Sequence, residues 1–149
     1  MRKIFKFALL CAFSSVIFCY SCKKSSSSSP SSTSSDPRDA IAGSWIVTDN
    51  ISYTIAGNTT HTYVLNVSKG SASDAIVLTN FEGEKGVVIN AILNGSSFTI
   101  PSQTVKDGTN AQVTGSGTFS GNTVTYTYNL AESDEWGGNA TSRSTGTKK

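Results

Sequence analysis

The stretch Gly43-Ser44-Trp45-Ile46-Val47-Thr48-Asp49-Asn50-Ile51-Ser52-Tyr53 is the first part of the chain in which apolar and polar residues alternate. Trp45, Val47 and Ile51 fall on one face of an extended strand, because successive side chains of a strand point to opposite sides. Asp49 falls on the same face and interrupts its apolar character once. The alternation predicts a β-strand with one buried face, and it marks the start of the folded part of the chain.

Seven further short runs follow this strand, and glycine, asparagine or serine turns separate most of them. They cover residues 61–67, 75–81, 87–93, 98–106, 113–119, 124–130 and 139–147. Asn94-Gly95 is a strong two-residue hairpin signal, and Pro101 restricts its strand to an edge, an end or a bulge. The sequence has no long helical period. This pattern predicts an all-β domain of eight strands.

Short connections favour antiparallel pairing between strands that are neighbours in the sequence. Eight antiparallel strands in a meander can close into a barrel, which removes the exposed edges of the sheet. The interior of such a barrel is wide enough to be filled by side chains or to hold one small ligand. We therefore expect an eight-stranded antiparallel up-and-down barrel. A two-sheet β-sandwich of the same strands is the alternative.

The N-terminus has the features of a secretion signal. Basic residues precede an uncharged run over residues 7–20, which is shorter than the roughly 20 apolar residues of a membrane-spanning helix. The cysteines all lie in or just after this segment, at Cys11, Cys19 and Cys22, which excludes a disulfide framework in the folded part. Cys22 follows the small residue Ser21, so the segment resembles a bacterial lipobox with Cys22 as the acylated residue, although Cys19 stands where leucine is usual.

These features predict that the chain has three parts. We expect a lipoprotein signal peptide over residues 1–21, the lipidated Cys22 with a disordered serine-rich tether over residues 22–38, and a barrel domain over residues 39–149. The tether lacks large apolar residues, so it has no means of forming a core. An acylated Cys22 would attach the domain to a bilayer. Ordinary signal cleavage, with Cys22 as a bystander, is the alternative.

The charge of the chain argues against a nucleic-acid partner. The sequence has 12 basic and 10 acidic residues, but Arg2, Lys3 and Lys6 belong to the signal. Without these three, 9 basic residues stand against 10 acidic ones, which gives a net charge of −1. No basic patch remains, so nucleic acid is not an expected partner. We expect a bacterial envelope location, anchored to the outer membrane on its periplasmic or its surface face.

Gly43-Ser44-Trp45 at the start of the first strand resembles the Gly-x-Trp motif that opens lipocalins and their calycin relatives. Other segments resemble small lipocalin-like lipoproteins of Bacteroidetes, namely Thr79-Asn80-Phe81, Ile100-Pro101-Ser102-Gln103 and residues 115–123. The resemblance covers most of residues 40–130 and implies that Trp45 closes the bottom of the barrel. It also implies that an arginine near the last strand packs across the tryptophan ring, and Arg143 is the candidate.

The residues with the greatest binding potential are aromatic. Four tyrosines share strand faces with apolar residues and should point inward, where they either line a cavity or fill it. His61 shares a face with Tyr63, and Trp136 lies in a polar loop, where it either contacts a ligand at the rim or plugs the barrel end. The candidate ligand-binding residues are Tyr53, His61, Tyr63, Tyr126, Tyr128 and Trp136.

The sequence shows no catalytic or metal-binding signature. The chain has one histidine, and it has no cysteine after residue 22. It therefore lacks a clustered set of metal ligands and a nucleophile paired with a base. Two carboxylate pairs, Glu82 with Glu84 and Asp134 with Glu135, lie among turn residues and are interpreted as solvated surface. We expect no enzymatic activity, no cofactor and no metal.

Two functions from different classes remain. In the first, the barrel binds a small apolar or amphipathic molecule at the cell envelope, which the inward tyrosines favour. In the second, the barrel is filled and serves as a structural or interaction module that docks to an envelope complex or an extracellular polymer. The inward glycines Gly115 and Gly117 favour this second function, because small residues let the barrel walls approach each other.

Overall fold

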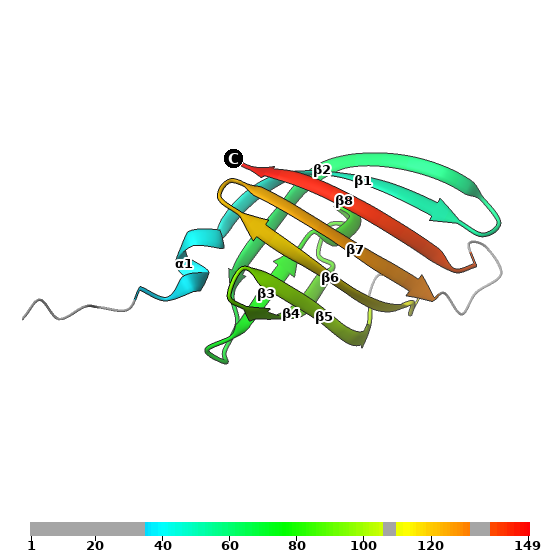
Figure 1. Cartoon of the computed structure of the whole chain (residues 1–149). Coiled ribbons are helices and arrows are strands. Elements are labelled where there is room, and N and C mark those ends of the chain that lie inside the picture. Colours follow the sequence, from blue (N-terminus) through cyan, green and yellow to red (C-terminus); the bar gives the residue numbers. More distant parts are fainter. Residues whose placement is uncertain (1–34, 106–109, 132–137) are drawn as a thin grey trace, which may run out of the picture. The chain divides into compact units, whose positions relative to one another are not determined.

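The computed structural model describes residues 35–105, 110–131 and 138–149. Eight antiparallel strands follow one another in sequence order, and the last strand pairs with the first to close a barrel (Figure 1). The strands are β1 (Gly43–Tyr53), β2 (Gly57–Lys69), β3 (Ala75–Thr79), β4 (Val88–Asn94), β5 (Ser97–Thr104), β6 (Gln112–Ser120), β7 (Thr123–Ala131) and β8 (Ala140–Lys148). The predicted up-and-down barrel is confirmed, and the sandwich is excluded.

Two short helices lie within the described residues, α1 (Pro37–Ile41) before β1 and η1 (Phe81–Gly83) between β3 and β4. In this part of the chain no helix has the length and apolar character needed to cross a membrane. Asp36 caps α1 by accepting a hydrogen bond from the Arg38 amide at 2.9 Å, and proline stands in the first turn, where its missing amide proton costs nothing. α1 begins at Pro37, two residues before the expected start of the barrel domain at residue 39. Cys22 lies outside the described residues.

We call the end of the barrel that carries α1 and the C-terminus, at the left in Figure 1, its lower end. Trp45 is fully buried and packs on Phe119, with 5.2 Å between the ring centroids. Its Nε1 donates a hydrogen bond to the Ile41 carbonyl at 2.9 Å. Lys148 places Nζ 5.8 Å from the Trp45 ring centroid and donates to the Ala40 carbonyl at 2.6 Å. The helix and this lysine together cover the tryptophan.

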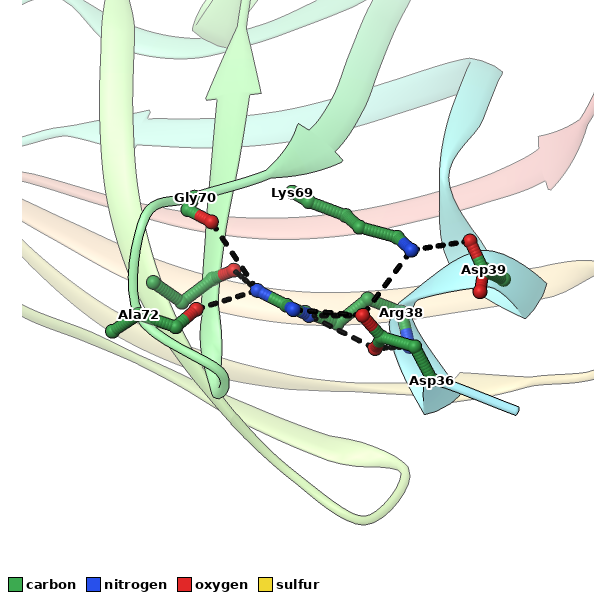
Figure 2. A network of polar contacts seen from close by, with 7 residues as sticks. Asp36, Arg38, Asp39, Lys69, Gly70 and Ala72 are labelled. Carbon is green, nitrogen blue, oxygen red and sulfur yellow. Dashed lines mark hydrogen bonds and ion pairs between the residues drawn. The ribbon is translucent and has the colours of Figure 1, made fainter. Parts of the chain in front are cut away.

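Arg38 fastens α1 to the loop between β2 and β3 (Figure 2). Its guanidinium donates to the Gly70 carbonyl at 3.2 Å and to the Ala72 carbonyl, and it pairs with the Asp36 carboxylate at 2.7 Å. Lys69 also contacts Asp36, at 3.2 Å. Hydrogen bonds from Arg38 hold the pKa of Asp36 well below its usual range. Residues that precede the barrel thus belong to its folded lower end.

Inward-facing glycines of β6 make room for the tyrosines of β7. Gly115 pairs with Tyr128, and Gly117 pairs with Tyr126. A Cβ atom at Gly117 would overlap Tyr126 and the Phe98 ring. The tyrosine rings therefore lie where side chains of β6 would otherwise stand. The largest fully buried side chains are Trp45, Tyr128, Phe81, Leu65, Ile76, Leu78, Ile89, Ile100, Val47, Val105, Val113 and Val124.

The upper end of the barrel carries the turn between β1 and β2 and the connection between β3 and β4. Strands β3 and β4 have 5 and 7 residues, whereas β1 and β2 have 11 and 13. Because β3 pairs only with residues 66–69 of β2, the upper part of β2 has no strand on that side. Residues 80–87, which we call the β3–β4 segment, pack there: a Cβ at Gly83 would lie 3.2 Å from Tyr63 Cβ.

The seam between β4 and β5 is also incomplete toward the upper end. The two strands pair only over residues 92–94 and 97–99. Farther up, the Gln103 side chain bridges them, since its Nε2 donates to the Asn90 carbonyl at 2.7 Å and its Oε1 accepts from the Asn90 amide at 2.9 Å. The register of β5 against β6 shifts between Ile100 and Gln103, which is a bulge of the kind that Pro101 predicts.

Candidate functional site

Asp49 places a carboxyl group inside the barrel. It lies on the inward face of β1 and is 0% exposed. Its Oδ2 accepts hydrogen bonds from the hydroxyls of Tyr63 and Tyr128, both at 2.9 Å. Its Oδ1 is buried and accepts no hydrogen bond from the described residues. Leaving a buried acceptor unpaired costs about 1–3 kcal/mol, so such an atom is uncommon and marks a candidate site.

Further hydroxyl groups surround this carboxyl group. The Tyr126 and Tyr63 hydroxyls lie 2.8 Å apart, and the hydroxyls of the buried residues Ser142 and Ser144 lie 3.4 Å apart on β8. Three strands, β1, β7 and β8, are hydrogen-bonded neighbours here, and β2 adds Tyr63 from the other side of β1. We call Asp49, Tyr63, Tyr126, Tyr128, Ser142 and Ser144 the Asp49 cluster.

Burial determines the protonation of the Asp49 cluster. It raises the pKa of Asp49 above its ordinary value, and contacts from Ser144, Tyr63 and Tyr128 offset only part of that shift. Burial also raises the pKa of all three tyrosines, so their hydroxyls stay neutral and act as donors. Among the described residues, no lysine or arginine forms an ion pair with Asp49. The carboxyl group is thus held by neutral hydroxyls alone.

The β3–β4 segment covers the Asp49 cluster. The Phe81 ring is 0% exposed, and its centroid lies 4.7 Å from that of Tyr128 and 6.2 Å from that of Tyr126. The Tyr128 hydroxyl also lies 2.8 Å from Glu82 Oε1. One hydroxyl therefore stands between the carboxyl groups of Glu82 and Asp49. Because it has a single proton, the second contact needs a proton that is held by a carboxyl group.

The backbone of the β3–β4 segment adopts uncommon conformations. Asn80 and Glu82 have φ of 61° and 58°, and Gly83 and Gly86 have φ of 82° and 90°. Asparagine tolerates this left-handed region, but a residue such as glutamate is strained there by about 1–2 kcal/mol. Such strain persists only where the surroundings impose it, and it clusters at binding sites and switches. Here the strained residue is the one whose carboxyl group reaches Tyr128.

The structure brings three of the six aromatic and histidine candidates together. Tyr126 and Tyr128 are 3% and 1% exposed, and Tyr63 is half-buried beside them. Tyr53 is half-buried near the end of β1 and packs against the core. His61 is exposed, with Nε2 3.2 Å from the Thr59 hydroxyl. Trp136 lies outside the described residues.

The expectation that Arg143 covers Trp45 is wrong. Arg143 is exposed on the outer face of β8, opposite Asn50 of β1 and Thr127 of β7. The inward residues of β8 have even numbers, so residue 143 points away from the interior in which Trp45 lies. Lys148 supplies the cation over the tryptophan instead.

Sequence reasoning missed three features of this site. The alternation places Asp49, a polar residue, at an inward position of its strand. A single polar residue in an apolar strand face does not show whether the position is a binding site or a bend in the strand. Phe81 reads as the end of an apolar strand, whereas Asn80 turns the chain and sends the ring into the barrel. Glu82 reads as solvated surface because its neighbours are turn residues, yet its carboxyl group contacts Tyr128. No pattern in the sequence indicates this last contact.

A metal site has no basis in the described part of the chain. Within residues 35–105, 110–131 and 138–149, no three histidine, cysteine, aspartate or glutamate side chains gather closely enough to hold an ion. The groups that converge on the Asp49 cluster are phenols and aliphatic hydroxyls, together with two carboxyl groups. This arrangement is suited to hydrogen bonding with an organic molecule.

Comparisons with known proteins support the barrel fold and do not identify a family or a function. No protein-family model matches the sequence, and no curated protein matches it. A solved structure of EF1p2_mFAP2b bound to DFHBI matches with a TM-score of 0.53 and 16% identity, over 77% of this chain and 100% of the other. A protein from Bacteroides fragilis NCTC 9343, described provisionally as an outer membrane protein, matches with a TM-score of 0.49 and 17% identity, over 76% of this chain and 53% of its own length.

Proposed function

We propose that this chain is a non-catalytic envelope lipoprotein whose barrel binds one small amphipathic molecule in its upper half. The observation that carries this proposal is the buried Asp49 carboxyl group with one unpaired oxygen. Binding sites for small molecules combine apolar and aromatic walls with a few convergent polar groups. The Asp49 cluster supplies the polar groups, and the rings of Tyr126, Tyr128 and Phe81 supply the walls.

The β3–β4 segment is the route by which a ligand would enter. In the structure described here the Phe81 ring fills the space against Tyr126 and Tyr128, so a ligand would take the place of this ring. Two features favour movement of the segment: its positive φ angles, and the incomplete pairing of β4 with β5. A segment with few strand hydrogen bonds opens at a lower free energy than the surrounding sheet.

A second barrel gives this proposal a precedent of suitable size. EF1p2_mFAP2b has DFHBI bound, and all of that chain aligns with this one. That chain binds one small organic molecule, and the interior of an eight-stranded barrel is of a width that can hold one small ligand. At 16% identity the likeness concerns the fold, and the ligand of that protein says nothing about the ligand of this one.

Membrane attachment through Cys22 is the second part of the proposal. Its support is the basic and apolar N-terminal segment, the small residue before Cys22 and the serine-rich stretch after it. The resemblance to lipocalin-like lipoproteins of Bacteroidetes agrees with the outer membrane as the location. Cys22→Ala should release the protein from membranes and abolish labelling with a palmitate analogue. Labelling that persists in this variant would contradict the anchor.

Ligand binding can be tested by stabilisation against heat. The full chain, reconstituted in lipid nanodiscs, would be unfolded in the presence of a panel of neutral, acidic and basic amphipathic compounds. A ligand that binds only the folded state raises the melting temperature in a saturable manner. We expect at least one compound to do so, and to lose its effect when Asp49→Leu removes the carboxyl group. A panel in which no compound at millimolar concentration stabilises the protein would contradict the proposal.

A filled barrel that docks through its outer face is the second candidate function. Thr118, Thr125, Thr145, Thr48 and Thr62 lie side by side across β6, β7, β8, β1 and β2, and their side chains are exposed or half-buried. Such a row of hydroxyls suits a hydroxyl-rich polymer. Co-sedimentation with insoluble polysaccharides, and its loss in Thr125→Lys, would support this function, whereas sedimentation unaffected by Thr125→Lys would argue against it.

A further inference from the structure

The Asp49 cluster has a surplus of hydrogen-bond acceptors. The Tyr128 hydroxyl lies 2.9 Å from Asp49 Oδ2 and 2.8 Å from Glu82 Oε1, but its one proton serves one of them at a time. The Tyr63 hydroxyl donates to Asp49 Oδ2 as well, which leaves Oδ1 without a donor. A ligand with N–H or O–H groups would supply the donor that Oδ1 lacks.

An ionised Asp49 would have no cation paired with it. Among the described residues no lysine or arginine forms an ion pair with Asp49, and the three tyrosines of the cluster are neutral. His61 of β2 acts on the Asp49 carboxyl group through its charge, but its side chain is exposed. A buried carboxylate is costly unless a positive group pairs with it. A cationic ligand would supply both the charge and the N–H groups.

The walls of the site exclude a small hydrated cation and favour an organic one. The ring centroids of Phe81 and Tyr128 lie 4.7 Å apart, and those of Tyr126 and Tyr128 lie 6.1 Å apart. Aromatic faces attract ammonium groups by about 0.5–2 kcal/mol, more where water is excluded. Calcium and magnesium instead require six or more oxygen ligands, and the described residues gather no such set.

We infer that the upper half of the barrel binds an organic ammonium ion, a protonated amine carried on a ring of about the size of a phenyl group. The amine donates to Asp49 Oδ1, and its ring takes the place of the Phe81 ring against Tyr126 and Tyr128. This inference rests on the proposed function and narrows its ligand to one class. A neutral molecule of the same shape fills the same space but leaves the carboxylate without a counter-charge.

Two probes of matched shape test this inference. Benzylamine is protonated at pH 7, and benzyl alcohol is its neutral counterpart. Calorimetric titration of the full chain in nanodiscs, corrected with empty nanodiscs, should show benzylamine binding at least tenfold more tightly than benzyl alcohol. Asp49→Asn should abolish this preference. Glu84→Gln, which neutralises an exposed carboxylate of the same β3–β4 segment, should retain it. Phe81→Ala should strengthen the binding of both probes, because it vacates the position of the ring.

The outcomes separate this inference from the proposed function. Equal affinities for the two probes would overturn the ammonium assignment and leave a neutral amphiphile as ligand. A benzylamine preference that survives Asp49→Asn would overturn it as well. If neither probe binds the wild type or Phe81→Ala, the assignment is also overturned, while the broader panel of amphipathic compounds decides the proposed function. Should Asp49→Asn fail to fold, as judged by circular dichroism, the comparison of the two probes on the wild type still decides.

Discussion

At the lower end of the barrel Trp45 donates its Nε1 proton to Ile41 and lies beneath the Lys148 ammonium group. At the upper end Asp49 is equally buried, yet one of its carboxyl oxygens has no donor. Both positions lie on the inward face of β1, four residues apart. Aromatic rings pack closely at both ends. The difference is that the upper end leaves a buried acceptor unpaired under a strained segment.

Some strands are also paired less completely at the upper end than at the lower end. β1 pairs with β2 from residue 43 to residue 53 and with β8 from residue 45 to residue 53. β4 pairs with β5 over three residues at the lower end, and a glutamine side chain replaces the strand hydrogen bonds above them. The upper end is therefore less completely paired than the lower end on the side formed by β3, β4 and β5.

The largest expected effect comes from truncating the ring at the centre of the lower end. Trp45→Ala should lower the free energy of unfolding by about 3–5 kcal/mol, the usual range for a buried aromatic residue. Phe81→Ala at the upper end should cost no more than about 3 kcal/mol, since the β3–β4 segment lies outside the sheet and can shift in response. Urea unfolding monitored by circular dichroism measures both values. A larger loss for Phe81→Ala than for Trp45→Ala would invert the comparison.

A smaller loss of stability is expected from a substitution in β6, where its glycines face the tyrosine rings of β7. Gly117→Ala adds a Cβ that would overlap Tyr126 and Phe98, and overpacking of this kind costs about 1–3 kcal/mol. Ser116→Ala, at the neighbouring exposed position, should change stability by no more than about 0.5 kcal/mol. Equal stability of the two variants would show that the barrel wall moves freely at this point.

Lys148 and Arg143 form a matched pair of cations on one strand. Lys148→Met removes the ammonium group over Trp45 and its hydrogen bond to Ala40, so it should cost about 1 kcal/mol. Arg143→Met alters an exposed side chain on the outer face, and it should cost no more than about 0.5 kcal/mol. A double-mutant cycle with Trp45→Phe should show coupling for Lys148 and none for Arg143. Coupling between Arg143 and Trp45 would contradict the observed face of β8.

Asp49→Asn should reduce the pH dependence of stability. Burial raises the pKa of Asp49 in the folded state, whereas the unfolded chain has an ordinary value of about 3.9. The folded protein therefore holds an extra proton above about pH 4, and its stability falls as the pH rises toward the folded-state pKa. Asp49→Asn removes this dependence, so its stability relative to the wild type should increase as the pH rises above about 4. Parallel curves for the two proteins would contradict a raised pKa.

Much of the fold could be predicted because its signals are local. Alternation places Tyr126 and Tyr128 on the inward face of β7, and Asn94-Gly95 provides the tight turn, with Gly95 at φ of 62°. Pro101 indicates the bulge because it lacks an amide proton for the ladder. Each of these predictions depends on one strand or one turn, and needs no knowledge of what packs across the barrel.

The last strand shows why the faces were harder to predict. Residues 140–148 have serines on one face, threonines on the other, and no large apolar residue on either. Ser142 and Ser144 are the inward residues, while Thr141, Arg143 and Thr145 face solvent. The period of two was visible, but nothing in the side chains indicated which phase was buried. Arg143 is a candidate through the lipocalin resemblance alone, and the sequence of this strand holds no signal that could correct it.

The candidate site could be predicted only in part, because it is assembled from contacts across the barrel. The inward tyrosines follow from strand periodicity. The position of Phe81 depends instead on the left-handed turn at Asn80, and the contact of Glu82 depends on the distance to Tyr128 on the opposite wall. The contacts of Phe81 and Glu82 with Tyr128 join residues more than 40 positions apart. The pattern of a single strand carries no information about such contacts.

Native-state hydrogen exchange tests the contrast between the two ends most directly. The amides of Asn80, Gly83, Glu84 and Val87 all donate hydrogen bonds within the β3–β4 segment, so their exchange reports its opening. We predict that these amides exchange through an opening several kcal/mol below global unfolding, whereas the paired amides around Val47 at the lower end exchange only on global unfolding. Equal protection at both ends would contradict the account, because the upper end would then be as firmly closed as the lower one.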